Sequence, residues 1–346
     1  MTDDTHTPEH DPVRRRLFKV AGIAAAAGAS SLPFSTSAAP SQKTGASMPN
    51  ASNTPLEDPR SLYPHAPFKA QPQEWPGLAS KMTPLPDHGE KSYKGSGRLA
   101  GRKALITGGD SGLGRAAAIA YAREGADVAI NYLPQEEADA KEVAELVRKE
   151  GRKFVALPGD LRDEKFCQDL VKRAAEELGG LDIFVNCAGR QQTHDSILDV
   201  TTEAFDWTLK TNLYALFWLS KAAIPLMKPG STMIFTSSTN AYEPSVNILD
   251  YSITKAGISN FAKGLAKQLV EKGIRVNAIA PGPFWTALQV SGGQTMENVE
   301  KFGETVPMKR PGQPVELAPV YVMLASSESS YLTGQVVGAN GGVGLP

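Results

Sequence analysis

The sequence predicts an α/β protein built on one doubly wound parallel sheet of about seven strands, with helices on both faces. From residue 98 onward, short apolar runs alternate with amphipathic segments, and Gly or Pro ends most of them. A glycine-rich turn directly follows the first apolar run. This alternation is typical of parallel strands joined by right-handed helical crossovers. Such sheets bind ligands at the carboxyl ends of their strands, near the point where the strand order reverses.

Strands and helices alternate in a regular order along this part of the chain. The expected strands are rich in Val, Ile, Leu and Ala and cover residues 103–107, 127–132, 153–158, 181–186, 232–237, 274–280 and 335–338. The expected helices have an apolar stripe and cover residues 113–124, 135–150, 163–178, 203–227 and 251–272. Gly179-Gly180 and Pro229-Gly230 are stop signals that follow two of these helices.

The first forty residues have a different composition. Residues 14–19 read RRRLFK, and an Ala-rich stretch and then the small-residue motif STSAA follow. This order is typical of a secretory signal, and the paired Arg15 and Arg16 resemble a twin-arginine export signal. We therefore expect a signal peptide at residues 1–39 and a periplasmic mature protein. The alternative is a disordered basic tail on a cytoplasmic protein.

Residues 40–97 form a second segment, rich in Pro, Ser and Gly. A free linker would gain nothing from large apolar side chains, because it has no core to bury them in. The segment nevertheless carries several of them, among them Tyr63, Phe68, Trp75, Leu78 and Met82. We therefore expect an extended N-terminal arm that lies on the catalytic domain, residues 98–346, or on a neighbouring subunit.

The composition excludes several classes of protein. With 36 basic and 37 acidic residues the net charge is −1, which excludes binding to nucleic acid through a broad basic field. Two cysteines, Cys167 and Cys187, cannot make a disulfide-rich scaffold. No apolar run after residue 40 is long enough to span a membrane. The five histidines show no metal-ligand spacing, so we expect no metal site.

The glycine-rich turn TGGDSGLG covers residues 107–114, between the first strand and its helix. Gly108 permits the sharp turn, Gly112 permits a pyrophosphate to approach the backbone, and Gly114 permits close helix packing. The N-terminus of the helix then offers unpaired N–H groups and the positive end of its dipole. A turn of this kind, placed after a strand and opening a helix, favours a dinucleotide site over an ordinary loop.

Tyr251 and Lys255 in YSITK lie four residues apart on one face of a predicted helix. A tyrosine titrates near pH 10, which makes it a poor acid–base group at neutral pH. An adjacent ammonium group favours the phenolate and lowers this pKa. Alone, such a pair is more often an ordinary surface pair. Ser238, which ends the fifth strand thirteen residues before Tyr251, makes a catalytic role more plausible.

Together these motifs resemble the short-chain dehydrogenase/reductase family over residues 98–340. The resemblance rests on TGGDSGLG, Asp160, NCAG at 186–189, Asn212, Ser238, YSITK and Pro281-Gly282. Segments such as KMTPLPDHGEKSYKGSGRL are similar to those of bacterial stress-associated dehydrogenases and NADP-dependent aldehyde reductases. The family usually has NAAG where this chain has NCAG, a conservative change at Cys187. The fold implied is a single Rossmann-type domain.

The resemblance implies a hydride transfer between nicotinamide and a carbonyl or alcohol substrate. Tyr251 would be the acid and base, and Lys255 would lower its pKa and bind the nicotinamide ribose. Ser238 would hold the substrate oxygen; Ser237 competes for this role but fits the family spacing less well. Asn212 would hold a water that relays protons from Lys255. A nucleotide-sensing or interaction module with an idle site is the alternative function.

The expected cofactor is NADP(H), with NAD(H) possible. An acid at the end of the second strand would select NAD, but residues 130–133 contain none, and no Arg or Lys stands there to bind a 2′-phosphate. Asp160 with Leu161 would contact the adenine, although Asp160 could instead cap the next helix. The residues expected to contact the dinucleotide are Gly108, Asp110, Ser111, Gly112, Leu113, Asn131, Tyr132, Asp160, Leu161, Asn186, Ala188, Gly189, Tyr251, Lys255, Pro281, Gly282 and Thr286.

The substrate side of the cleft is expected to combine aromatic and hydrogen-bonding groups. Its candidate residues are Arg190, Gln191, His194, Asn240, Tyr242 and Glu243, with Phe284, Trp285 and Leu288 as a lid. This mixture suits an aldehyde, a ketone or a polyol. By resemblance, the protein is expected to be a homo-oligomer, a tetramer formed through the helices near residues 203–227 and 251–272.

Overall fold

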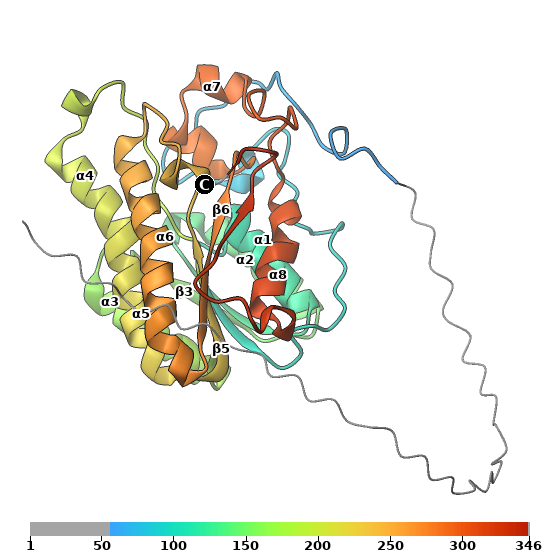
Figure 1. Ribbon diagram of the computed structural model, residues 1–346. Coiled ribbons are helices and arrows are strands. Elements are labelled where there is room, and N and C mark those ends of the chain that lie inside the picture. The colour runs from blue at the N-terminus through green and yellow to red at the C-terminus, as the bar shows by residue number, and fades with distance from the viewer. Residues whose placement is uncertain (1–55, 345–346) are drawn as a thin grey trace, which may run out of the picture. The chain divides into compact units, whose positions relative to one another are not determined.

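The structure, a computed structural model, describes residues 56–344, and the signal peptide expected at residues 1–39 lies outside them. Within the described part, seven strands form one parallel sheet in the order β3-β2-β1-β4-β5-β6-β7 (Figure 1). The strands are β1 (Lys103–Thr107), β2 (Asp127–Tyr132), β3 (Phe154–Pro158), β4 (Leu181–Asn186), β5 (Met227–Thr236), β6 (Arg275–Pro281) and β7 (Val336–Ala339). This confirms the predicted doubly wound sheet, whose strand order reverses between β1 and β4.

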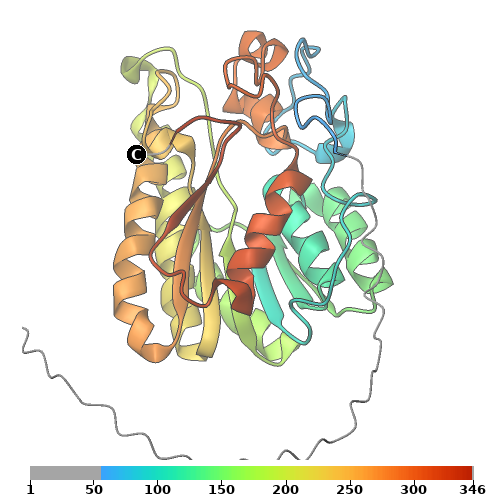
Figure 2. The same ribbon diagram turned by 45° about the vertical axis from the view of Figure 1, so that its right-hand side comes forward.

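Helices cover both faces of the sheet (Figure 2). They are α1 (Gly112–Arg123), α2 (Glu137–Lys149), α3 (Glu164–Leu178), α4 (Thr202–Leu209), α5 (Ala215–Ala223), α6 (Leu249–Leu269), α7 (Met296–Glu300) and α8 (Pro314–Ala325). One apolar core joins α1, α2 and α8 to the sheet, and a second joins α3, α5 and α6 to the other face. No helix among the described residues is both long and apolar enough to cross a bilayer.

The prediction of one unbroken helix over residues 203–227 is wrong. A π-helical turn, η4 (Lys210–Tyr214), separates α4 from α5, and the 3₁₀ turn η5 (Ile224–Leu226) ends the run before β5. The Asn212 side chain accepts from the Arg190 N–H (2.7 Å) and donates to the Arg190 carbonyl (2.9 Å). Its amide also donates to Thr254 Oγ1 (2.9 Å). These bonds tie η4 to two other segments, and such a tertiary constraint cannot be read from helical periodicity.

Helix α8 is absent from the prediction because its sequence lacks an apolar stripe. Most of its side chains are buried, so apolar residues occur on every side. Pro314 occupies the first turn, where its missing N–H costs nothing, and Glu316 accepts from the Gln313 N–H (2.8 Å). Tyr121 of α1 donates its hydroxyl to the Tyr321 carbonyl (3.1 Å), which joins α8 to the first crossover.

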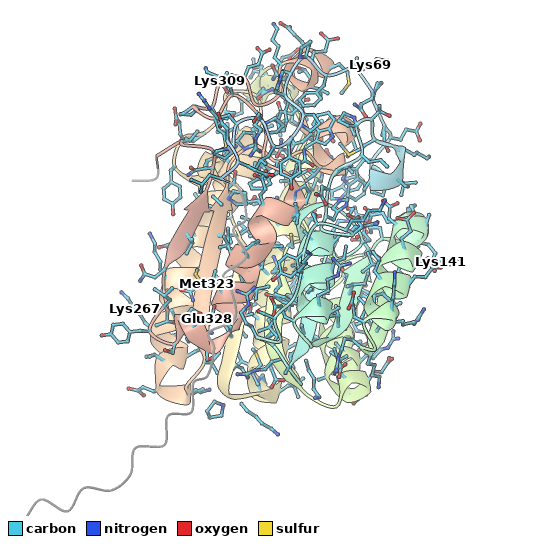
Figure 3. The ribbon with its side chains drawn as sticks, turned by 90° about the vertical axis from the view of Figure 1, so that its right-hand side faces the viewer. Lys69, Lys141, Lys267, Lys309, Met323 and Glu328 are labelled. Atoms are coloured by element: carbon cyan, nitrogen blue, oxygen red, sulfur yellow. The ribbon has the colours of Figure 1, made fainter. Side chains whose placement is uncertain are left out.

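Residues 56–97 pack against the same unit as the sheet, and residues 59–84 do so at the carboxyl end of the sheet. Phe68 stacks on Trp285 (ring centroids 4.2 Å apart), and Met82 packs in the same small core. Arg310 donates to the Pro59 carbonyl from two nitrogens (2.6 and 2.8 Å). Figure 3 shows the segments that carry Lys69 and Lys309 together at this end. The arm therefore belongs to the packed structure at the end where the ligand cleft is expected.

Candidate active site

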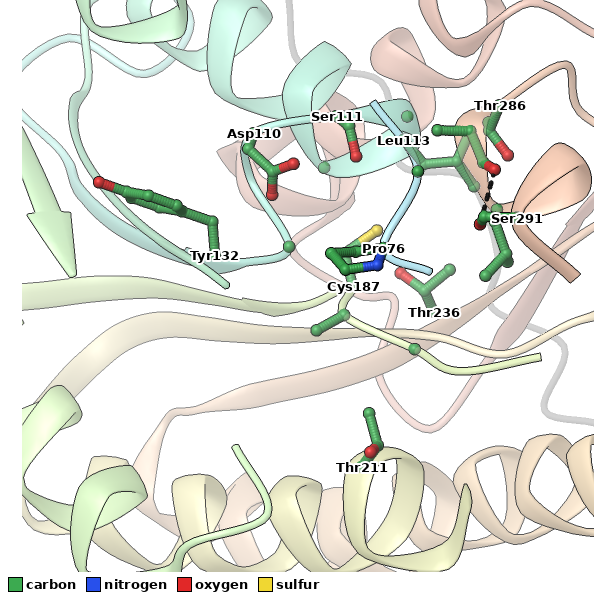
Figure 4. A pocket seen from close by; sticks show the side chains of 18 of the residues that line it. Pro76, Asp110, Ser111, Leu113, Tyr132, Cys187, Thr211, Thr236, Thr286 and Ser291 are labelled. Carbon is green, nitrogen blue, oxygen red and sulfur yellow. Dashed lines mark hydrogen bonds between the residues drawn. The ribbon is translucent and has the colours of Figure 1, made fainter. Parts of the chain in front are cut away.

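A cleft with about 1210 Å³ of open space lies at the carboxyl ends of the strands (Figure 4). Of the predicted site residues, those that line it are Gly108, Asp110, Ser111, Gly112, Leu113, Asn131, Tyr132, Asp160, Leu161, Ala188, Gly189, Ser238, Tyr251, Lys255, Pro281, Gly282 and Thr286. Among the predicted catalytic and dinucleotide-binding residues, Asn186 and Asn212 are the two that do not line it. Residues separated by almost 180 positions thus meet in one site, as expected for a doubly wound sheet.

The glycine turn is suited to a dinucleotide because it is packed so tightly that only glycine fits at these positions. A Cβ atom on Gly114 would lie 2.0 Å from the Gly108 carbonyl oxygen, and one on Gly108 would lie 2.9 Å from Ala188 Cα. Gly108 also has a positive φ of 62°. Helix α1 has no side-chain N-cap among residues 56–344, so its first N–H groups remain available to phosphate oxygens.

Asn186 has a supporting position below this turn. Thr107 Oγ1 donates to Asn186 Oδ1 (3.2 Å) and accepts from the N–H groups of Cys187 (3.1 Å) and Ala188 (3.2 Å). These bonds hold the NCAG segment beside β1. Asn186 therefore shapes the base of the cleft from behind, whereas Ala188 and Gly189 face it.

Ser238, Tyr251 and Lys255 meet at the other end of the cleft. The Tyr251 phenol is 7% exposed, and the Ser238 side chain lies near enough to lower its pKa. Lys255 Nζ lies 5.3 Å from the centre of the Tyr251 ring and donates to the Thr236 carbonyl (2.8 Å). Ser237 Oγ instead donates to the Lys255 carbonyl (2.8 Å), away from the phenol. The geometry therefore favours Ser238 over Ser237 as the partner of Tyr251.

The pKa of Tyr251 differs from the expectation. Burial raises it to about 12, and the neighbouring Ser238 side chain opposes this rise. Burial also lowers the pKa of Lys255 to about 8. In the protein alone, desolvation is the largest influence on both pKa values, and Lys255 is not among the groups that shift the pKa of Tyr251, so the expected lowering by Lys255 is not found. Tyr251 is a neutral phenol at pH 7, which is the form that can donate a proton.

The opposite end of the cleft carries acidic residues. Asp160 lines it and pairs with Arg162 (2.6 Å). Asp163, and not Asp160, caps α3 by accepting from the Phe166 N–H (2.7 Å). Glu136, in the 3₁₀ turn η2 (Pro134–Glu136), also lines the cleft and was not predicted. The signal was present in LPQE, because Pro followed two positions later by Glu is typical of a capped turn.

Part of the arm forms a wall that the sequence did not reveal. Trp75, Pro76 and Gly77 line the cleft, and Gln73 is fixed nearby because its N–H donates to the Val290 carbonyl (2.9 Å). A Cβ atom on Gly77 would lie 2.9 Å from Ser291 Cβ, so this contact is tight. The large apolar residues indicated that the arm packs on something, but they could not indicate where.

The substrate side agrees with the prediction only in part. Phe284 and Leu288 line the cleft, but Trp285 is fully buried and donates Nε1–H to the Pro84 carbonyl (2.8 Å). Trp285 is thus an anchor for the arm, and its assignment as a lid residue is wrong. The other candidates lie outside the cleft lining: Arg190, Gln191, His194, Asn240, Tyr242 and Glu243. Arg190 is buried with its guanidinium 4.2 Å from the centre of the Trp207 ring.

The two cysteines are free thiols, and Cys187 lines the cleft. Burial raises the pKa of the Cys187 thiol, so it is a poor nucleophile. Among residues 56–344, no three His, Cys, Asp or Glu side chains are placed to hold a metal ion.

Comparisons with known proteins agree with this geometry. A family model described as enoyl-(acyl carrier protein) reductase matches residues 108–344. A crystal structure of a short-chain dehydrogenase from Burkholderia cenocepacia in complex with NADP superimposes with a TM-score of 0.67. It is 32% identical and covers 71% of this chain and 98% of its own. This chain belongs to the short-chain dehydrogenase/reductase family.

Two further family members bear on the activity. The uncharacterized oxidoreductase YghA of Escherichia coli is 59% identical over 83% of this chain and 98% of its own length. NADPH-dependent aldehyde reductase 1 of Arabidopsis thaliana is 42% identical over 77% of this chain and 94% of its own. The chain is therefore an NAD(P)-dependent oxidoreductase of this family, and the alternative of a sensing or interaction module is not favoured.

Proposed function

We propose that the protein interconverts an aldehyde or ketone and the corresponding alcohol, with Tyr251 as acid and base. The observation that carries this proposal is the buried phenol of Tyr251, which lies beside Ser238 and Lys255 in the cleft. A bound nicotinamide dinucleotide supplies or accepts the hydride. A carbonyl oxygen that receives a hydride on its carbon needs a proton, and a neutral phenol at hydrogen-bond distance can donate one.

Each neighbouring residue has a separate role in this proposal. Ser238 donates its hydroxyl to the substrate oxygen and holds it against Tyr251. Lys255, fixed by the Thr236 carbonyl, binds the ribose next to the nicotinamide and places a positive charge near the phenol as the proton leaves. Asn212 is a positioning residue, because its side chain is fully engaged by Arg190 and Thr254. A water on the backbone of η4 would relay protons from Lys255.

The favoured cofactor is NADP(H), with NAD(H) possible. The Arabidopsis relative is named for NADPH, and the Burkholderia structure contains NADP. The cleft supports a dinucleotide in general through its glycine turn and the open end of α1. The predicted set of contacts, from Gly108 to Thr286, is the site that we propose for it, with Asn186 supporting it from behind.

The substrate is an aldehyde, a ketone or a polyol, and the decisive experiment is a panel assay. The purified protein is assayed for reduction of aldehydes and ketones with NADPH and NADH, and for oxidation of sugars and polyols with NADP⁺ and NAD⁺. We expect turnover of at least one aldehyde and a lower KM for NADPH than for NADH. No turnover across the panel by a protein that binds dinucleotide would favour the sensing module.

A firmly held cofactor would suit a periplasmic enzyme, where free dinucleotide is scarce. Residues 1–39 are proposed to export the protein by the twin-arginine route, which carries folded proteins with their cofactors. The wall formed by Trp75 to Gly77 would slow cofactor release after export. After loading and extensive dialysis, the absorbance spectrum should still show nucleotide, and complete loss would contradict this proposal. Cell fractionation distinguishes the periplasm from the cytoplasm.

The homotetramer remains a proposal that rests on exposed apolar side chains. Tyr214, Phe217, Leu249 and Ile253 are each more than 40% exposed on η4, α5 and α6. Large apolar side chains exposed on neighbouring elements are typical of a subunit interface. Gel filtration of the full chain should give about four times the monomer mass of 36.9 kDa. A monomeric elution volume would contradict it.

A further inference from the structure

Two carboxyl groups stand where the cleft would receive the adenosine half of a dinucleotide. Asp110 lies on the glycine turn and Glu136 on η2, and both line the cleft. The turn is joined to the end of β2 because the Gly109 N–H donates to the Asn131 carbonyl (3.1 Å). Figure 4 shows Asp110 between Tyr132 of β2 and Ser111 of the turn. The two acids thus belong to one corner of the site.

Asp110 is not satisfied by the protein. It is 1% exposed, and its Oδ2 atom has no hydrogen-bond partner within the described part of the chain. A buried carboxylate oxygen without a donor is costly, so it needs a proton of its own or a donor from a ligand. Glu136 is half-buried and uses Oε2 to accept from the Leu133 N–H (2.9 Å).

No lysine or arginine of residues 56–344 lines this corner of the cleft. Among the described residues that line the cleft, Lys255 is the one lysine or arginine, and it lies at the catalytic end. Arg115 exerts an electrostatic effect on Asp110, but its guanidinium bonds with Glu90 (3.0 Å) and Glu142 (2.9 Å). A 2′-phosphate would therefore meet two carboxyl groups and no free positive charge.

We propose that Asp110 and Glu136 read the 2′ position of the adenosine ribose, and that a 2′-phosphate binds only when this pair carries a proton. The inference rests on the proposed function, which places a dinucleotide in this cleft. In such folds the pyrophosphate lies at the glycine turn, and an acid after the second strand reads the ribose. An ionised carboxylate accepts from a 2′-hydroxyl, whereas a protonated carboxyl donates to a phosphate oxygen. One pair can thus admit either cofactor.

The electrostatic surroundings favour a retained proton. Burial raises the pKa of Asp110, and burial followed by the charge of Asp110 raises the pKa of Glu136. The charged or titratable groups that interact with Asp110 are Asp139 of α2, Arg115 of α1, Tyr132 of β2 and Cys187, and those that act on Glu136 are Asp110 and Asp139. Asp139 is itself buried and accepts from the Ala79 N–H of the arm (2.6 Å). Acids therefore outnumber cations around the pair.

The consequence is a pH-dependent choice of cofactor. As the pH rises and the pair loses its proton, the affinity for a 2′-phosphate falls, by at most about tenfold per pH unit for one proton taken up. The affinity for a 2′-hydroxyl does not fall, because the carboxylate accepts from it. Discrimination in favour of NADP(H) should thus decrease with increasing pH.

Calorimetric titration of the full chain with two fragments tests this without catalysis. The ligands are adenosine 2′,5′-bisphosphate and adenosine 5′-monophosphate, each titrated at several pH values on both sides of neutrality. For the unmodified protein, the ratio of the bisphosphate Kd to the monophosphate Kd should rise by at least about tenfold across this range. An unchanged ratio, with the monophosphate still binding, overturns this inference and leaves the proposed function intact. If neither nucleotide binds at any pH, both fail.

Variants separate the carboxyl pair from the titration of the ligand phosphate itself. In Asp110→Asn/Glu136→Gln the Kd ratio should change less than about threefold over the same range, because only the phosphate then titrates. Glu136→Gln alone, at a half-buried position, should give an intermediate change and covers the case in which the double variant does not fold. Glu145→Gln, an exposed acid on α2, is the control and should behave like the unmodified protein. Equal pH dependence in all four proteins overturns the inference.

Discussion

The two ends of the cleft differ in whether their buried polar groups have hydrogen-bond partners within the protein. At the catalytic end, Lys255 donates to the Thr236 carbonyl, Ser238 accepts from the Asn240 N–H, and burial keeps the Tyr251 phenol neutral. At the adenosine end, Asp110 is equally buried, but one of its carboxyl oxygens has no hydrogen-bond donor among residues 56–344. The first arrangement is complete in the protein alone, whereas the second needs a proton or a ligand.

This difference indicates that the catalytic end acts mainly on the reaction rate and the adenosine end mainly on the choice of cofactor. A preorganised set of donors acts on the charge that develops in a reaction, and it loses most when one member is removed. A buried carboxyl without a hydrogen-bond donor acts mainly through the proton that it gains or loses. Its substitution therefore changes the cofactor preference more than the reaction rate.

Replacement of Tyr251 tests the catalytic end most severely. Tyr251→Phe removes the proton donor but keeps the ring, and we expect kcat to fall by about 10²–10⁴-fold. Steady-state rates with NADPH and an aldehyde found in the panel measure the loss. Tyr331→Phe, at a tyrosine that is 99% exposed, is the matched control and should keep full activity. Equal rates for the two variants would exclude Tyr251 as the acid.

Replacement of Ser238 should have the next largest effect. Ser238→Ala removes the hydroxyl that holds the substrate oxygen, and a single donor of this type is worth about 10²-fold in kcat. Ser237→Ala, whose hydroxyl bonds with Ser259 (2.7 Å) and the Lys255 carbonyl, should reduce kcat much less. A reversed order of the two effects would transfer the role to Ser237.

The pH dependence of the free energy of unfolding distinguishes a buried carboxyl that has hydrogen-bond donors from one that lacks a donor. Glu124 is fully buried; hydrogen bonds from Arg98 and Tyr93 overcome burial and lower its pKa to about 2. Its contribution is therefore present above the unfolded pKa and is lost as the pH falls through the folded value. Glu124→Gln should cost about 3 kcal/mol at neutral pH, as measured by urea unfolding.

For Asp110, the change of stability with pH should have the opposite sign. Its folded pKa is raised, so stability is lost as the pH rises from the ordinary carboxyl value of about 4 through the raised one. Asp110→Asn should therefore leave the free energy of unfolding unchanged in acid and increase it at alkaline pH. A decrease at alkaline pH, like that of Glu124→Gln, would show that Asp110 has a partner after all.

The smallest effect is expected for the arm, because it forms one wall of the cleft and contains none of the proposed catalytic residues. Trp75 lies edge-on to Trp207 (ring centroids 5.4 Å apart) and covers one side of the cleft. Trp75→Ala should increase the dissociation rate of a bound dinucleotide by about tenfold, through the loss of roughly 1.4 kcal/mol of contact. Stopped-flow fluorescence of NADPH release measures it, and Leu85→Ala, an exposed position on the same arm, is the control. Unchanged release would remove the arm from the proposed site.

Most of the fold could be predicted because each crossover repeats the same local pattern. Strands β1, β2 and β4 begin and end at the predicted residues, since apolar runs and turn residues define them. The prediction missed helix α8 because this helix is buried on all sides. It missed the break at η4 because this break depends on the bonds of Asn212 with Arg190 and Thr254. Local periodicity contains no information on either constraint.

The site was predictable to the extent that its residues sit in short motifs. Ser238, Tyr251 and Lys255 lie together as their spacing indicated. Glu136 and Trp75 reach the cleft through a 3₁₀ turn and an arm, and their positions depend on tertiary packing. The pKa of Tyr251 depends on burial, which the spacing to Lys255 could not reveal.

The most direct test of the central claim is a single turnover by Tyr251→Phe loaded with NADPH. We predict that the variant binds NADPH as tightly as the unmodified protein, and that the nicotinamide absorbance does not decay when an aldehyde is added. Decay at the rate of the unmodified protein would contradict the account, because the proton would then come from a group other than Tyr251.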